Sequence, residues 1–297
     1  MDNLQHGIEG LTEITPEEMK ASMSEGLDID ALTQAGFSVR TQEVPVAEFE
    51  TYLQEIDYDT AYPSYVSSFS KAYVGSGKDA SGVNRKYFEQ FLSIYLTTPG
   101  PDHVTVDIAA ANGPFSSILA THCKVAKSYH QDLNPPNRRV HEYLGRDAIV
   151  PIQCNAGELP FEDGSIDRMY LLNSWEHFQA PSDVDFLIEA ERCLAPDGQV
   201  MIVPLNATRQ AFVQTDPDLW DNKQIYEKGQ QPMFRQNVPV HVRKCGQVYA
   251  QNHDAEMLID FARRTPGLAY EVVQVSLDDP RAWFPTNSWN ILIATKR

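Results

Sequence analysis

The stretch VDIAAANGPFSS, residues 106–117, joins an apolar run to a turn of small residues. The run predicts a strand, and Pro114 directly after the turn is typical of a helix start. In a parallel α/β sheet, ligands bind where such a turn meets a helix N-terminus, because backbone N–H groups are free there. The turn is therefore a candidate ligand site, although alanines replace the glycines that usually allow close backbone approach.

The spacing of the small residues distinguishes two kinds of cofactor. A dinucleotide fingerprint GxGxxG aligned at position 109 would need glycine at 109, 111 and 114, where the chain has Ala, Ala and Pro. NAD is therefore disfavoured. The alternative pattern, acidic-x-G-x-G-x-G, falls in register with this stretch. The candidate cofactor residues here are Asp107, Ala109, Ala110, Ala111 and Gly113.

Polar side chains also follow the next two predicted strands. The second strand ends at Asp132 and Leu133, and an acidic side chain at that point can accept hydrogen bonds from both hydroxyls of a ribose. The third strand ends at Asn155 and Ala156. An amide both donates and accepts, so Asn155 suits the edge of an adenine ring.

The order of these strands and motifs resembles class I S-adenosylmethionine-dependent methyltransferases. The resemblance rests on the turn, on Asp132, and on the blocks LPFEDGSID (159–167) and LAPDG (194–198), which precede the fourth and fifth strands. It covers residues 88–205 most clearly. It implies S-adenosylmethionine as the cofactor, held by the residues above, and a small-molecule substrate.

The predicted strands and helices that position these residues alternate along the chain. This alternation predicts an α/β fold. We expect a Rossmann-like, doubly wound, mostly parallel seven-stranded sheet, with the last two strands as an antiparallel edge. The predicted strands are 103–108, 125–133, 150–156, 166–173, 199–205, 270–277 and 287–296, and the predicted helices follow Pro114 and cover 184–198 and 255–264.

Two further segments are expected to cover the site. Residues 1–87 predict an N-terminal helical cap or lid, in which Thr15 caps a helix that begins at Pro16. Residues 88–297 predict the cofactor-binding domain. Within it, residues 206–250 show no clear period and predict an irregular lid inserted after the fifth strand.

The residues after the fourth strand are the catalytic candidates, because they face the methyl group in this architecture. They are Asn173, which also counts as a cofactor residue, Trp175, Glu176 and His177. Trp175 either contacts the sulfonium through its ring face or packs in the core. His177 is either a general base or a residue that packs the loop, and Glu176 is expected to be structural.

Aromatic side chains of the cap and the insertion supply the remaining candidates. Tyr65, with its neighbouring tyrosines, either closes over the substrate or forms a hydrophobic seam between cap and core. In the insertion, Arg235 would suit a substrate carboxylate. The other residues considered are Tyr58, Tyr62, Tyr73, Trp220, Tyr226 and Phe234.

The alanines of the turn restrict the φ angles that its backbone is expected to adopt. Because Ala109 and Ala111 carry methyl groups, we expect negative φ angles at both, with Asn112 taking the left-handed turning position.

Composition excludes several classes of partner. A net charge of −17 over 297 residues repels nucleic acid and anionic lipid surfaces. The chain shows no apolar run of transmembrane length and no secretory leader, so we expect a cytoplasmic location with reduced cysteines. No metal-ligand spacing is visible, and a homodimer is possible.

The sequence therefore predicts a metal-independent enzyme of specialised metabolism that methylates an N, O, S or carbanion acceptor. One alternative is an enzyme of the same fold that cyclises the aminobutyrate chain of S-adenosylmethionine and releases methylthioadenosine. The other is a non-catalytic module that only binds the cofactor.

Overall fold

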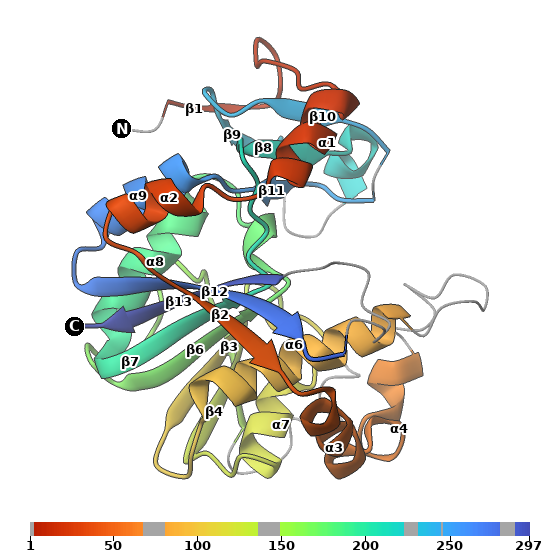
Figure 1. Ribbon diagram of the computed structural model, residues 1–297, viewed down its shortest axis with the longest axis vertical. Helices are drawn as coiled ribbons and strands as arrows, with labels where there is room; N and C mark the ends of the chain where they lie inside the picture. The colour runs from red at the N-terminus through yellow and green to blue at the C-terminus, as the bar shows by residue number, and fades with distance from the viewer. Residues whose placement is uncertain (1–2, 68–80, 136–148, 223–230, 245, 280–288) are drawn as a thin grey trace.

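The computed structural model describes residues 3–67, 81–135, 149–222, 231–244, 246–279 and 289–297, and its centre is a twisted sheet (Figure 1). The strand order is β2-β12-β13-β7-β6-β3-β4-β5, and among these eight strands β13 alone runs opposite to the others. Their bounds are β2 (Ser38–Val44), β3 (Val104–Ile108), β4 (Lys127–Asp132), β5 (Ile149–Gln153), β6 (Ile166–Leu172), β7 (Leu194–Val203), β12 (Leu268–Leu277) and β13 (Trp289–Lys296).

Helices cover both faces of this sheet, as a doubly wound fold requires (Figure 1). One apolar cluster joins one face to α2, α8 and α9, and a second cluster joins the other face to α3, α4, α6 and α7. The bounds are α2 (Ile29–Gln34), α3 (Val46–Ile56), α4 (Tyr58–Ala61), α6 (Ser81–Thr97), α7 (Phe115–Thr121), α8 (Ser182–Cys193) and α9 (Ala255–Arg264).

The predicted fold class is confirmed, with two differences in the sheet. The sheet has an eighth strand, β2, which pairs with β12, so the last two strands of the chain do not form its edge. The helix predicted over 184–198 ends at Cys193, and β7 begins at once with Leu194. A Cβ at Gly198 would lie 2.8 Å from the carbonyl oxygen of Ala195, so glycine allows the strand to start this close to the helix end.

The predicted helical cap and the predicted irregular lid are not two separate segments, because part of the first packs with the second. Among the described residues of 206–252, β8, β10 and β11 form a three-stranded sheet in the order β10-β8-β11, and β9 pairs with β1 from the N-terminus. We call residues 3–25 and 206–252 the cap lobe. Its elements are β1 (Leu4–His6), α1 (Pro16–Glu25), β8 (Phe212–Thr215), η3 (Pro217–Asn222), β9 (Met233–Arg235), β10 (Val240–Val242) and β11 (Ala250–Asn252).

Main-chain hydrogen bonds join the two parts of the cap lobe. Ile14 N–H donates to the carbonyl of Val240, and Val240 N–H donates to that of Thr12. The predicted N-cap is present, because Thr15 and Glu18 form a reciprocal capping box at the start of α1. The first 87 residues are therefore not one helical cap: their first part belongs to the insertion, and β2 and α3 belong to the main body.

A buried ion pair ties the cap lobe to the main body. Arg235 of β9 donates two hydrogen bonds to Asp183 of α8, at 2.6 and 2.8 Å. Gln251 of β11 also donates to Asp183. Burial alone would raise the pKa of Asp183, but the adjacent His253 ring and Arg235 guanidinium outweigh it and hold the pKa at about 2. The carboxylate is therefore charged in the folded protein and fixes the position of the lobe.

Candidate active site

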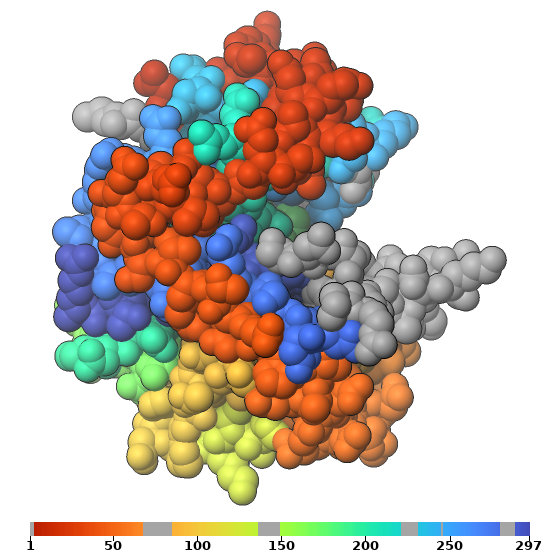
Figure 2. Space-filling model, in the orientation of Figure 1, coloured from red at the N-terminus to blue at the C-terminus, as the bar shows by residue number. Residues whose placement is uncertain are grey.

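A cavity of about 630 Å³ lies between the cap lobe and the main body, where the surface is hollowed in Figure 2. It opens at the carboxyl ends of β3 and β6, from which the chain winds in opposite directions along the sheet. Ligands of doubly wound sheets bind at such a switch point, and the volume falls in the range of small-molecule sites. The cavity is therefore the candidate active site.

The turn after β3, residues 109–113, forms one side of the cavity. Ala109 and Ala111 have φ angles of 52° and 48°, and Asn112 has no positive φ. The expectation of negative φ at both alanines, with Asn112 as the turning residue, was therefore wrong. Each alanine occupies the left-handed conformation that glycine adopts at little cost.

Residues at the end of β4 hold this strained turn in place. Ala109 N–H donates to the side-chain carbonyl of Gln131 at 3.0 Å, and Ala111 N–H donates to Asp132 at 2.9 Å. The Ala111 carbonyl lies 3.2 Å from Nε2 of the buried His130. These contacts compensate the left-handed backbone, so the turn keeps its shape without glycine.

Asp107 ends β3 and lines the cavity with its side chain only 3% exposed. Oδ2 accepts a hydrogen bond from Ser116 N–H at 3.3 Å, and Oδ1 has no partner among the described residues. Burial raises the pKa of Asp107 to about 8, and the nearby Asp132 charge adds to the effect. A cationic ligand group next to Oδ1 would favour the ionised form.

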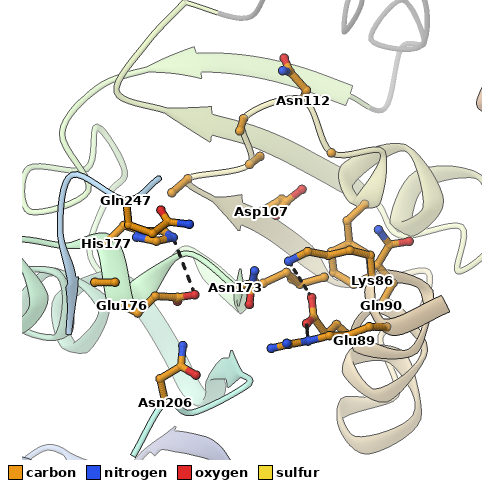
Figure 3. A pocket seen from close by; sticks show the side chains of 18 of the residues that line it. Lys86, Glu89, Gln90, Asp107, Asn112, Asn173, Glu176, His177, Asn206 and Gln247 are labelled. Atoms are coloured by element: carbon orange, nitrogen blue, oxygen red, sulfur yellow. Dashed lines mark hydrogen bonds and ion pairs between the residues drawn. The ribbon is translucent and has the colours of Figure 1, made fainter. Parts of the chain in front are cut away.

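One face of α6 brings three charges to the same end of the cavity. Glu89 is fully buried and pairs with Lys86 at 3.0 Å and with Arg85 at 3.2 Å. Burial raises the pKa of Glu89, and the two cations oppose the rise. Figure 3 shows Lys86 and Glu89 on α6, joined by their ion pair.

The segment after β6 supplies the polar groups opposite the β3 turn. Asn173 has a φ of 54°. Its side-chain amide has no hydrogen-bond partner in the described part of the chain. Glu176 and His177 follow in the short helix η2 (Trp175–His177), with His177 Nε2 3.8 Å from Glu176 Oε1. Figure 3 shows Asn173 and Glu176 between Asp107 and Asn206.

The hydrogen bond of the His177 ring defines its tautomer. Nδ1 lies 2.8 Å from the backbone carbonyl oxygen of Tyr249, which can only accept, so Nδ1 carries the proton. In the neutral ring Nε2 then holds the lone pair. His177 can therefore accept a proton at Nε2, and the Glu176 carboxylate is close enough to stabilise the resulting imidazolium.

Trp175 does not reach the cavity. Its ring is 1% exposed, stacks on His253 with centroids 4.1 Å apart, and donates from Nε1 to the carbonyl of Asp183. The hypothesis that this ring contacts the sulfonium is corrected to its alternative, a packing role that fixes η2 against the core.

The predicted cofactor residues divide between the cavity and the neighbouring strand ends. Those that line the cavity are Asp107, Ala109, Ala110, Ala111, Gly113 and Asn173. The other four lie at the ends of β4 and β5, which are adjacent because Cys154 N–H donates to the carbonyl of Asp132. Leu133 is 48% exposed there, Asn155 is exposed, and Ala156 is buried.

The tyrosines of the first segment divide in the same way. Tyr65 lines the cavity. Tyr58 and Tyr62 are buried against α6 and α7, where Tyr58 bonds to Tyr52 and Tyr62 donates to Ser117. The last two therefore form the hydrophobic seam rather than a lid. The predictions for Tyr73 and Tyr226 fall outside the described residues.

The insertion residues expected to touch substrate are buried in the cap lobe. Trp220 donates to Thr215, and Phe234 is fully enclosed. Arg235 is 4% exposed and committed to Asp183. A guanidinium that is buried and bidentately paired cannot also bind a substrate carboxylate, so that hypothesis is corrected.

Several lining residues were not anticipated from the sequence. Arg85, Lys86 and Glu89 come from α6, and Met23 comes from the N-terminal helix. The spacing of 85, 86 and 89 on one helix face was a usable signal. Nothing in the sequence around position 23 shows that α1 folds back over the insertion.

Comparison with protein families gives a match over part of the chain. Residues 106–202 match the family model described as a methyltransferase domain. The match begins in β3 and ends in β7, so it spans the β3 turn, the β4 and β5 ends and η2. No curated protein matches the chain.

Solved structures with a similar fold share little sequence with this chain. A putative methyltransferase of Haloferax volcanii, solved with its Trm112 activator, is 16% identical, with 76% of this chain and 96% of that chain covered and a TM-score of 0.45. A 1,6-didemethyltoxoflavin N1-methyltransferase of Burkholderia thailandensis is 14% identical, with 84% and 89% covered and a TM-score of 0.45. A geranyl diphosphate C-methyltransferase of Streptomyces coelicolor is 15% identical, with 77% and 90% covered and a TM-score of 0.43.

The doubly wound sheet, the polar cavity at its switch point and the domain match define a cofactor-dependent group-transfer enzyme. Residues 106–202 are similar to a methyltransferase domain, and S-adenosylmethionine is the cofactor that this similarity supports. Within the described ranges, no helix is both long and apolar enough to cross a membrane.

Proposed function

We propose that this enzyme methylates a hydroxyl or N–H group of a small molecule, and that His177 accepts the proton which the acceptor releases. The observation that best supports this proposal is the tautomer of His177. Nδ1–H donates to the Tyr249 carbonyl, so Nε2 has the lone pair and can accept a proton in the cavity. An acceptor that loses a proton needs such a base within reach. The location in the cytoplasm, a homodimer and a role in specialised metabolism stay predictions.

The residues of the cavity fit the amino-acid end of S-adenosylmethionine. Asp107 Oδ1 lacks a partner and faces the cavity, where it would bind an ammonium group. Lys86 and Arg85 would attract the carboxylate. A Cβ at Gly113 would lie 3.1 Å from the Ala110 carbonyl oxygen, so a side chain at this position would crowd the turn. When bound, the cofactor supplies an electrophilic methyl group.

The neighbouring strand ends fit the nucleoside end. Asp132 would accept hydrogen bonds from the ribose hydroxyls, and the exposed Leu133 offers an apolar surface to adenine. Asn155 and Ala156 lie beside them. Asp132 also holds Ala111 N–H and Asn134 N–H, so the same carboxylate orders the turn and the sugar site.

Calorimetry of S-adenosylhomocysteine binding tests this assignment. Asp132→Ala should weaken binding by about 1.5–3 kcal/mol, because a charged hydrogen-bond acceptor is lost. Asp102→Ala, at an exposed position outside the cavity, is the matched control. An unchanged affinity in Asp132→Ala would remove this residue from the site.

Incubation of the pure protein with S-adenosylmethionine alone separates the alternative chemistry. The proposed function predicts no methylthioadenosine. Its accumulation without an acceptor would favour cyclisation of the aminobutyrate chain, and binding of the cofactor without turnover of any acceptor would favour a non-catalytic module.

A further inference from the structure

The part of the cavity formed by the cap lobe has an unusual composition. Residues 206–252 contribute six lining residues, and five of them are amides. We call these five the amide wall. They are Asn206, Gln214, Gln247, Gln251 and Asn252. The sixth is Ala250, so no charged side chain of this segment lines the cavity in the described ranges.

Three cations of the same segment each have a partner elsewhere in the cap lobe or on α8. Arg235 is buried against Asp183, Arg243 donates to Gln214, and Lys244 pairs with Asp218 at 3.0 Å. A site for a phosphate or carboxylate normally supplies an arginine or lysine. The wall is therefore not built for an anionic group.

Two amides of the wall are positioned but have no partner. Asn206 and Asn252 are half buried, and neither side chain has a hydrogen bond in the described part of the chain. Their backbones are fixed: the Asn206 carbonyl accepts from His253 N–H at 2.9 Å, and Asn252 pairs with Phe212 in the small sheet. Figure 3 shows Asn206 facing the cavity below Glu176.

Rigid, unpartnered amides select a particular kind of ligand. Each one offers both a donor and an acceptor and stays neutral at all pH values. A ligand group that lacks matching donors or acceptors would leave the amides desolvated and unpaired, which weakens its binding. An apolar acceptor is therefore disfavoured as well as an anionic one.

We infer that the acceptor is an uncharged molecule with several hydroxyl, amide or carbonyl groups, which binds through Asn206 and Asn252 while its reacting group faces His177. This inference rests on the proposed function. The core side of the cavity carries the charged groups that would bind the cofactor. The amide wall would form hydrogen bonds with the neutral acceptor.

A panel of acceptors tests the inference. Three sets matched in size, each bearing a phenol, amine or ring N–H, would be incubated with the enzyme and S-adenosylmethionine: neutral molecules with three or more hydrogen-bonding groups, carboxylates or phosphates, and apolar molecules. Release of S-adenosylhomocysteine is measured. Turnover concentrated in the neutral set supports the inference. Turnover concentrated in another set, or in none, overturns it.

Variants of the wall sharpen the result. Asn206→Ala and Asn252→Ala should each lower kcat/KM for the neutral acceptor about 10-fold, and Asn252→Lys should shift preference toward the anionic set. Gln210→Ala, an exposed amide of the same lobe outside the cavity, is the control. Equal activity of the Asn206, Asn252 and Gln210 variants would overturn the inference.

The same protein sample separates the two possible failures. If it does not bind S-adenosylhomocysteine in the calorimeter, the proposed function fails. If it binds this product and uses anionic or apolar acceptors, the proposed function stands and the inference about the amide wall is wrong.

Discussion

The two walls of the cavity differ in charge and in origin. The core wall, built from α6, β3 and η2, carries the buried carboxyl groups of Asp107, Glu89 and Glu176. It also carries two cations, Arg85 and Lys86, which pair with Glu89. The amide wall, built from the cap lobe, is neutral. Charged groups lie where a zwitterionic cofactor end would bind, and neutral groups lie where the acceptor would bind. In the proposed function, the doubly wound fold binds the cofactor and the cap lobe selects the acceptor.

Removing the anchor between the two walls should have the largest effect. Asp183→Ala leaves Arg235 as a buried, unpaired charge, so we expect a loss of about 3–5 kcal/mol in the free energy of unfolding. Urea denaturation measures it. Asp218→Ala, which removes an exposed ion pair with Lys244, should cause no measurable change. A loss for Asp183→Ala as small as for the control would show that the lobe is held by other contacts.

Changing the base on the core wall should affect rate more than binding. His177→Gln should lower kcat at least about 100-fold, because proton removal from the acceptor is lost, and should leave S-adenosylhomocysteine affinity unchanged. His122→Gln, outside the cavity, serves as control. A kcat close to wild type would mean that the acceptor needs no base.

The pKa of Asp107 predicts a pH dependence of stability. Burial raises this pKa from 3.8 to about 8, so the folded state retains a proton that the unfolded chain releases. The stabilisation is complete below about pH 4 and is lost as the pH rises through 8. Asp107→Asn should therefore lose less thermal stability than wild type between pH 5 and 8.5. Parallel melting curves of the two proteins would contradict the raised pKa.

The left-handed conformation of Ala111 predicts that glycine substitutions at positions 111 and 110 change the stability of the protein in opposite directions. Ala111→Gly should stabilise the protein by about 0.5 kcal/mol, because relief of a strained φ exceeds the added entropy of the unfolded chain. Ala110→Gly, where φ is not positive, should destabilise it by about 0.5–1 kcal/mol. Denaturant titration measures both. Effects of the same sign would argue against the backbone described for the turn.

The core wall was far more predictable from sequence than the cap. Each strand from β3 to β7 was predicted near its observed position, and β3, β6 and β7 contain the apolar runs that buried parallel strands require. Their carboxyl ends meet at one edge, so the sequence alone predicts that Asp107, Asn173 and His177 lie close together.

The amide wall could not be predicted in this way. Its strands are three or four residues long, too short for a periodic pattern. One of them, β10, also bonds to residues more than 200 positions away, as Val240 does with Ile14. The sequence allowed Arg235 to be a ligand of a substrate carboxylate, because only the fold shows that Asp183 lies against it. Trp175 was ambiguous for the same reason, since its partner His253 comes from the far end of the insertion.

The backbone of the turn was mispredicted for a physical reason. Alanine disfavours positive φ by itself, but three contacts from the end of β4 outweigh that preference. Local propensity is a weak guide where neighbouring strands determine the conformation.

A crystal structure with bound S-adenosylhomocysteine tests the division between the two walls most directly. The account predicts the sulfur between the β3 turn and Asn173, the ribose on Asp132, and Asn206 and Asn252 facing an open space beside the sulfur. A nucleoside lodged against Asn206 and Asn252, or bound outside this cavity, would contradict it.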